Sequence, residues 1–193
     1  MPKLWDATIE AHRRGVEEAV IGATARLVSE HGLRAVTMSQ IAETAGIGRA
    51  TLYKYYPDVE AILDAWHERE IGAHFSQLEQ ARDGADGAAG RLEAVIRAFA
   101  EVTQESHGSH SAELVAFLHG KGRVAHAKGH LRDMVLDLIV DAAAAGAVRD
   151  DVPADELAGY CISALAVARE LPEATAVARL VDVTLTGLRF RED

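Results

Sequence analysis

The segment "TMSQIAETAGIGRATLYKYYPD", residues 37–58, constrains the fold more than any other part of the sequence. It holds two short runs of apolar residues at helical spacing, separated by Gly46, and it ends in tyrosines and a lysine before Pro57. Gly46 can adopt the left-handed conformation that ends a helix. Pro57 disfavours helical conformation at the residue before it. The pattern therefore predicts a helix, a sharp turn and a second short helix, which is a helix-turn-helix.

The residue types inside this segment fit two short helices that cross closely. Thr37 and Gln40 have the T-x-x-Q spacing of a capping box, so we expect the first helix over about 38–45. The second is expected over about 49–55, and Ala42 is small enough for the helices to approach each other. The apolar residues expected to face their shared core are Ile41, Ile47 and Leu52.

Most of the second short helix has no core to serve. Its residues Arg49 to Tyr55, apart from Leu52, are of the types that contact phosphates and base edges in a DNA major groove. Tyr56 is expected to close the core of the segment instead.

Hydrophobic periodicity predicts an all-α chain of about nine helices without an internal repeat. Outside the two short helices, the expected helical ranges are about 9–31, 58–81, 91–106, 112–126, 130–145, 154–171 and 173–190. Glycine-rich or polar breaks separate several of them. We therefore expect a helix-turn-helix head, residues 1–57, followed by a helical body, residues 58–193.

Composition indicates a soluble cytoplasmic protein with no membrane partner. The chain of 193 residues is 49% apolar, enough for a sizeable core. Its one cysteine, Cys161, excludes an internal disulfide and fits a reducing compartment. The N-terminal residues lack the apolar run of a signal peptide, and no uncharged apolar stretch is long enough to span a bilayer.

Charge is distributed unevenly along the chain. Residues 1–56 carry seven Lys/Arg and six Asp/Glu, for a net charge of +1, whereas residues 57–193 carry 13 and 24, for −11. The total of −10 argues against a chain that binds nucleic acid throughout. A near-neutral head on an acidic body is typical of a division between two functions, although ordinary surface variation would also give it.

The stretch "RLVSEHGLRAVTMSQIAETAGIGRATLYKYYPDVEAIL", residues 26–63, resembles the tetracycline-repressor (TetR) family of transcriptional regulators. Within it, "TLYKYY" is similar to the T-L-Y-x-x-F-like signature of that family. Sequence detail covers about the first 65 residues, and the remainder matches in length and helical pattern. The resemblance implies a homodimer without cofactor. Its heads would bind double-stranded operator DNA, and its body would hold a small-molecule effector pocket and the dimer face.

Carried over by position, the resemblance implies contacts to DNA from Thr37, Ser39, Arg49, Ala50, Thr51, Tyr53, Lys54 and Tyr55. The first two would lie near phosphates, the next three near base edges, and the last three would contact phosphate or bases. Two positions depart from the family pattern. Gly48 stands where a serine often caps the recognition helix, at a cost of about a few tenths of a kcal/mol. Val59 stands where a lysine often contacts phosphate, which predicts a lower non-specific affinity for DNA, with less salt dependence, than in a relative that has the lysine.

The body is expected to hold the effector and the second subunit. The candidate pocket residues are Trp66, Phe75, Phe99, Thr103, Phe117, Met134, Leu138 and Tyr160. The candidate dimer residues, all in the last two helices, are Leu165, Val177, Leu180, Val181, Thr184 and Leu188. Ordinary core packing is the alternative for both sets. With 5% aromatic residues, a small apolar effector is the better prediction, acting by releasing a repressor from a palindromic operator.

The sequence gives little indication of a metal site or of catalytic activity. Five histidines fall within 24 residues: His107, His110, His119, His126 and His130. His126 and His130 have helical spacing, but Gly129 lies between them; no nearby cysteine joins the histidines, although Glu105 and Glu113 could. Solvated loop histidines, or a pH-sensitive surface, are the simpler interpretations. The sequence has no H-E-x-x-H, G-x-S-x-G or glycine-rich phosphate loop, so we expect no metal, no catalytic residues and no enzyme. An adaptor that binds only proteins would leave the face of residues 49–55 unexplained.

Overall fold

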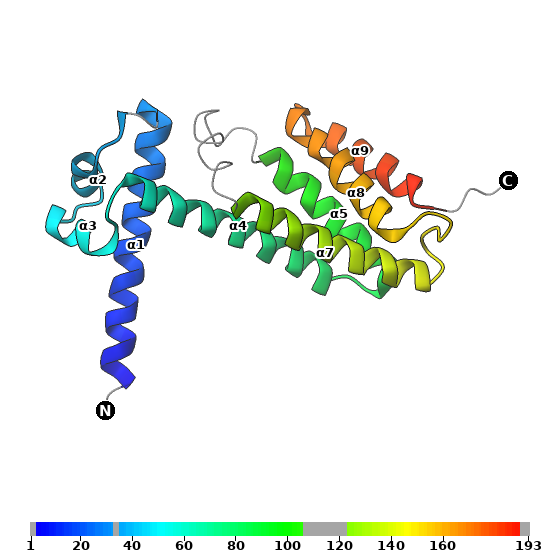
Figure 1. The fold of residues 1–193 in the computed structure, drawn as a ribbon, viewed down its shortest axis with the longest axis horizontal. Helices are drawn as coiled ribbons and strands as arrows, with labels where there is room; N and C mark the ends of the chain where they lie inside the picture. The colour runs from blue at the N-terminus through cyan, green and yellow to red at the C-terminus, as the bar shows by residue number, and fades with distance from the viewer. Residues whose placement is uncertain (1–2, 33–34, 106–122, 190–193) are drawn as a thin grey trace. The chain divides into compact units, whose positions relative to one another are not determined.

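The computed structural model describes residues 3–32, 35–105 and 123–189, with side chains described from residue 10 and again from residue 126. All regular secondary structure in these ranges is helical, as Figure 1 shows, and it comprises eight α-helices and one 3₁₀ helix. The prediction of an all-α fold is therefore confirmed. Contacts divide the described residues into two compact units, and the boundary between them along the chain falls between Glu70 and Ile71.

The first unit, called the head below, is built from three helices and the start of a fourth. They are α1 (Lys3–His31), α2 (Met38–Thr44), α3 (Arg49–Tyr55) and α4 (Val59–Asp83), of which the residues up to Glu70 belong to the head. Their buried side chains form one core: Val16, Val20, Ile21, Leu27, Val28, Val36, Met38, Ile41, Ala42, Leu52, Ile62, Leu63 and Trp66. The start of α4 thus belongs to the head, whereas the sequence-based division lies at residue 57.

Helix α1 begins several residues before the predicted range of 9–31. Side chains 10–15 are exposed, so no apolar periodicity marks this part of the helix. The local pair between Arg13 Nε and Glu17 Oε1, at 2.9 Å, lies one turn apart and supports the helix there.

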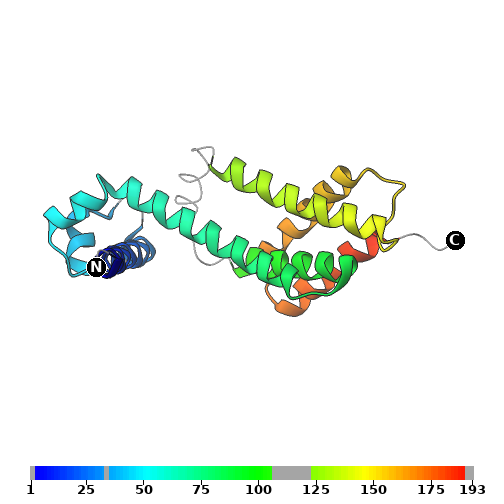
Figure 2. The ribbon, with the colours of Figure 1, turned by 90° about the horizontal axis from the view of Figure 1, so that it is seen from below.

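In the second unit the remaining helices pack around α5 (Gly87–Glu105), which contacts each of the four elements that follow it. These elements are α7 (Arg123–Ala144), α8 (Ala154–Leu165), the 3₁₀ helix η2 (Ala166–Glu170) and α9 (Ala174–Gly187). Figures 1 and 2 both show α8 and α9 side by side, next to α5.

The core of the second unit is apolar and includes one thiol. Leu92, Val95 and Ile96 of α5 meet Val135 and Ile139 of α7 in a single buried cluster. Cys161 is fully buried in the same cluster, and burial raises the pKa of its thiol to about 12. A thiol with this pKa is protonated at neutral pH, so Cys161 is a packing residue.

Two predicted helix boundaries in this unit are wrong. A break was expected before 130, yet α7 runs without interruption from Arg123 through Gly129 to Ala144. Glycine inside a helix costs only about 1 kcal/mol, and the buried face formed by Leu131 and its successors outweighs that cost. Residues 112–122 of the expected helix 112–126 lie outside the described residues. The expected helix 154–171 instead tightens into η2 after Leu165.

None of the described helices is long and apolar enough to cross a membrane.

Candidate nucleic-acid interface

A reciprocal capping box fixes the start of α2. The backbone N–H of Gln40 donates to Thr37 Oγ1 at 3.3 Å, and the backbone N–H of Thr37 donates to Gln40 Oε1 at 2.9 Å. Thr37 has extended backbone angles, φ −122° and ψ 153°, as an N-cap residue requires. The predicted capping box is confirmed. It also engages the Thr37 hydroxyl, which donates to the same Gln40 oxygen at 2.7 Å.

Replacing Thr37 by alanine is expected to lower the free energy of unfolding of the head by about 1 kcal/mol, because α2 loses its cap. Ser39 is the matched control, since it lies inside α2 and has no part in the capping box. Ser39→Ala should change stability by about 0.5 kcal/mol or less. Urea denaturation followed by circular dichroism measures both. Equal stability of Thr37→Ala and the parent chain would contradict the role of the box.

The turn between α2 and α3 depends on Gly46. Its φ is +69°, the left-handed region that residues with a Cβ adopt only with strain. The N–H of Gly46 donates to Glu43 O at 3.2 Å and that of Ile47 donates to Ala42 O at 3.0 Å, which closes the end of α2. Gly48 then begins α3 as an N-cap without a side-chain hydrogen bond, as its departure from the family pattern implied.

Helix α3 has one buried face and one exposed face. Leu52 is 0% exposed, whereas its neighbour Tyr53 is 55% exposed. Arg49, Ala50 and Lys54 are also exposed, while Thr51 is half-buried. The exposed set therefore forms a continuous polar and aromatic face on a helix that Leu52 anchors to the head.

Arg49 and Lys54 are the cations on this face, and neither has a carboxylate partner among the described side chains. Within the described residues, no side-chain carboxylate lies within ion-pair distance of Arg49 or Lys54. Both positive charges therefore remain available to an external anion such as a phosphate.

The C-terminal end of α3 is fixed by tyrosine packing. Tyr55 and Tyr56 are both partly buried against the core of the head. Burial raises the pKa of the Tyr56 hydroxyl, and the charge of Glu17 adds to that rise while Arg13 opposes it. Tyr56 thus closes the core, as the sequence predicted. Tyr55 shares this packing, so its predicted contact with DNA would use only the exposed part of the ring.

The side chains at the start of α4 serve capping and packing. Asp58 Oδ1 accepts a hydrogen bond from the N–H of Ala61 at 2.8 Å and so caps the helix. Val59 is partly buried and packs against the core of the head. An apolar side chain therefore serves packing at the position where a lysine would face phosphate.

The residues predicted to form one effector pocket lie in several places. Met134 and Leu138 line a common groove, described below, whereas Trp66 belongs to the core of the head. Phe99 and Thr103 are half-buried in α5, and the Thr103 hydroxyl donates to its own helix, to Phe99 O at 2.7 Å. Phe75 stacks on His130, Tyr160 is exposed on α8, and Phe117 lies outside the described residues.

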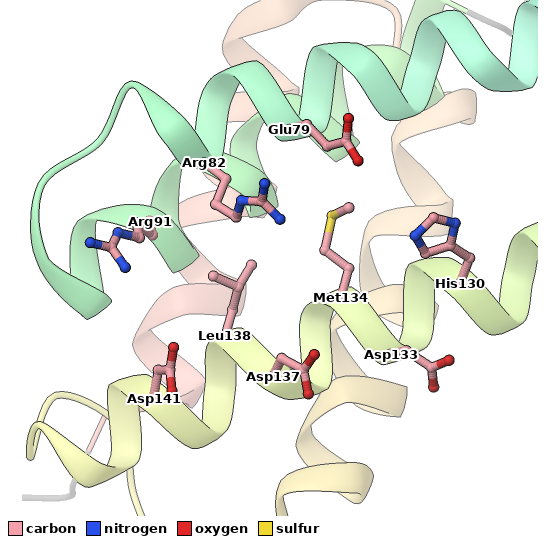
Figure 3. Close-up of a pocket in the computed structure, with 9 residues that line it drawn as sticks. All are labelled: Glu79, Arg82, Arg91, His130, Asp133, Met134, Asp137, Leu138 and Asp141. Carbon is pink, nitrogen blue, oxygen red and sulfur yellow. The ribbon is translucent and has the colours of Figure 1, made fainter.

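A groove of about 420 Å³ lies in the second unit between α7 and the segment formed by the end of α4 and the start of α5 (Figure 3). We call it the α4–α7 groove. Its lining residues are Glu79, Arg82, Arg91, His130, Asp133, Met134, Asp137, Leu138 and Asp141. Its charged residues were not among those predicted to form a pocket. The recurrence of aspartate every four residues at 133, 137 and 141 was the signal that could have indicated one polar helix face.

The predicted dimer residues lie in the core of the second unit. Leu165, Val177, Val181, Thr184 and Leu188 are buried within the chain itself, and Leu180 is partly buried against them. The exposed apolar side chains on the same stretch are Tyr160, Val167 and Val183.

The described histidines do not form a metal site. His126 and His130 are exposed on α7, and the His130 ring stacks on Phe75 with centroids 4.5 Å apart and planes 15° apart. In the described part of the chain, no three His, Cys, Asp or Glu side chains are grouped closely enough to hold a metal ion. His107, His110 and His119 lie outside that part.

Two family profiles match the two units. The profile of bacterial regulatory proteins of the tetR family matches residues 20–66, which contain the helix-turn-helix. The profile of the C-terminal domain of SbtR-like transcriptional regulators matches residues 87–190, more than half of the chain. This chain belongs to the TetR family. It is accordingly a TetR-family transcriptional regulator, and its head is a DNA-binding unit.

Solved structures of TetR-family regulators share the fold over nearly the whole chain. A TetR/AcrR-family regulator from Thermobifida fusca YX-ER1 has a TM-score of 0.71 at 16% identity, covering 90% of this chain and 98% of that one. The ketosteroid transcriptional regulator KstR2 of Mycobacterium tuberculosis has a TM-score of 0.65 at 18% identity, covering 91% and 95%. AibR in complex with isovaleryl coenzyme A and operator DNA has a TM-score of 0.61 at 16% identity, covering 90% and 97%. A comparison with curated proteins found no significant match.

Proposed function

We propose that this TetR-family regulator is a cytoplasmic, effector-responsive repressor that binds a palindromic operator as a homodimer. The observation that carries the proposal is the exposed face of α3, where Arg49, Tyr53 and Lys54 stand on a helix anchored by the buried Leu52. Solvent-exposed aromatic and basic side chains on a short, firmly packed helix are suited to the major groove. Among the described residues, none of these three side chains belongs to the core of the head or packs against it.

Each residue type on α3 fits a distinct contact. The guanidinium of Arg49 can donate two hydrogen bonds to a guanine, and the small exposed Ala50 allows the helix to approach the bases closely. Lys54 fits a phosphate, and Tyr53 fits either a phosphate or a base. Thr51 is half-buried and would contact DNA with its exposed part only.

Dimerisation is expected because a single head with little net charge would bind DNA weakly. The net charge of +1 on residues 1–56 gives one head little non-specific attraction for DNA. Two heads on one dimer would contact half-sites about 34–36 Å apart, and their linkage raises the affinity of the pair. The exposed Tyr160, Val167 and Val183 provide apolar surface for the partner subunit.

Regulation requires an effector that binds the DNA-free form more tightly than the DNA-bound form. AibR, a structural relative, has been solved with both isovaleryl coenzyme A and operator DNA, which supports the same two partner classes here. Helix α4 is the candidate lever, since its residues belong to both units. The apolar effector predicted from the sequence stays untested, and the charged lining of the α4–α7 groove favours a polar one.

Selection of bound fragments from random double-stranded DNA tests the proposal. We expect enrichment of an inverted repeat that is protected over two half-sites and bound by one dimer. Repeating the selection with candidate effectors should identify those that release the DNA, as a repressor requires. Failure to enrich any sequence, or enrichment of single half-sites bound by monomers, would overturn the proposal.

A further inference from the structure

The α4–α7 groove has an apolar floor beneath charged walls. Met134 and Leu138, one turn apart on α7, are only 8% and 5% exposed. Figure 3 shows their side chains between α7 and the end of α4. The groove runs along α7 from His130 to Asp141, a helical length of about 16 Å. This length and the volume of about 420 Å³ suit a short, extended small molecule.

The charges are separated along the groove. In Figure 3, Arg82 and Arg91 lie toward the end that holds Asp141, whereas Glu79, His130 and Asp133 lie toward the other end. One end therefore carries both guanidinium groups of the lining together with the carboxylate of Asp141, and the other end carries the carboxylates of Glu79 and Asp133.

Arg82 is oriented by its neighbour in a way that leaves donors for a ligand. Its Nε donates to Asp83 Oδ1 at 2.8 Å, and Figure 3 shows its terminal nitrogens over the groove. This hydrogen bond, together with the nearby charges of Arg82 and Arg91, holds the pKa of Asp83 below its usual value. Asp83 offsets part of the positive charge at this end and fixes the guanidinium plane.

We propose that the α4–α7 groove binds a zwitterion with an ammonium group and a carboxylate at opposite ends of a short alkyl chain. The carboxylate would meet Arg82 and Arg91, the ammonium group would meet Glu79 and Asp133, and the alkyl chain would cover Met134 and Leu138. The inference rests on the proposed function, because this molecule would be the effector of the regulator.

A singly charged ligand fits the same groove less well. An alkyl carboxylate would leave an apolar end beside Glu79 and Asp133, and an alkyl amine would leave one beside Arg82 and Arg91. In either case the ligand would form charge-assisted hydrogen bonds at one end of the groove only, and would gain less free energy than a zwitterion that forms them at both ends. Carboxylates outnumber guanidiniums in the lining, so the amine is the stronger competitor and must be a separate arm of the test.

Isothermal titration calorimetry on the full chain provides the test. The probes are ω-amino acids of about four to eight carbons, chosen because successive turns of α7 lie about 5.4 Å apart. Alkyl carboxylates and alkyl amines of matched length are the comparisons. We expect at least one ω-amino acid to bind about tenfold or more tightly than its matched acid and amine. Equal or tighter binding of either comparison, or absence of binding by the whole ω-amino acid series, would overturn the inference.

Two double variants assign the ends. Arg82→Gln with Arg91→Gln should remove the advantage of the amino acid over the amine. Glu79→Gln with Asp133→Asn should remove its advantage over the acid. Arg169→Gln, an exposed charge on η2 outside the groove lining, is the control and should leave all affinities unchanged. Thermal melting of each variant identifies any that has lost its fold. Unchanged preferences in a folded double variant would contradict the assignment of that end.

Operator binding, measured separately, keeps the two proposals distinguishable. A chain that binds a selected operator but no ω-amino acid would overturn the groove assignment and leave the DNA-binding function in place. A chain that binds an ω-amino acid but no DNA sequence would overturn the proposed function and leave the groove assignment in place.

Discussion

Replacing Tyr53 and Lys54 together by alanine is expected to weaken binding to the selected operator about 100-fold or more, with no change in thermal stability. Tyr53 is 55% exposed and Lys54 is exposed, so neither contributes to the core of the head. Loss of a base contact costs about 1–3 kcal/mol, and a dimer loses each contact twice. Fluorescence anisotropy at fixed salt concentration measures the affinity, and thermal melting measures the fold.

The control variant removes a similar pair of exposed side chains from the second unit. Lys128 and Val140 are exposed on α7, and their joint replacement by alanine should leave operator affinity unchanged. Lys54→Ala alone should also reduce the slope of log affinity against log salt by about 1 per head, because one phosphate contact is lost. Operator binding that survives the Tyr53 and Lys54 double replacement would rule out α3 as the DNA-reading helix.

The head could be predicted from sequence because its boundaries depend on local chemistry. The cap at Thr37, the left-handed Gly46 and the stop at Pro57 each act within a few residues. Such signals do not depend on the rest of the chain. The buried Leu52 and the exposed Tyr53 also follow from the helical period alone.

Helix α7 could not be predicted in the same way, because Gly129 is a weak local signal. The prediction of a break treated Gly129 as a helix stop, but a glycine inside a helix costs only about 1 kcal/mol relative to alanine. Leu131 and Val135 bury their side chains in the core of the second unit, and that packing continues the helix through the glycine. Tertiary contacts therefore decided a boundary that local preference left open.

The α4–α7 groove illustrates a different limit. Its charged residues come from the end of α4, the start of α5 and the middle of α7, which are far apart in sequence. Each of them reads in isolation as an ordinary solvated charge on a helix. Only the packing of the three segments shows that Arg82 and Arg91 share one end of a hollow with Asp141.

Apolar periodicity on the last two helices has a related ambiguity, because it shows that residues are buried but not which chain buries them. Leu165 was a predicted dimer residue, yet it is 0% exposed in the core of its own unit. Val167 and Val183, on the same stretch, are 46% and 66% exposed. The two roles predict opposite consequences of substitution, so they can be separated by experiment.

Leu165→Ala is expected to lower the free energy of unfolding by about 2–5 kcal/mol, because it leaves a cavity among well-packed neighbours. Val183→Asp should instead leave the fold intact and convert a dimer to monomers, because it places a charge on the proposed apolar interface. Urea denaturation at one fixed protein concentration measures the first, and light scattering after size-exclusion chromatography measures the second. Val167→Ala is the matched truncation of an exposed side chain and should change monomer stability by about 0.5 kcal/mol or less. A stable Leu165→Ala variant that is monomeric would return Leu165 to the interface. If the Val183→Asp variant stays dimeric, α9 does not form the dimer interface at this position, because an unpaired carboxylate buried in an interface would disfavour association.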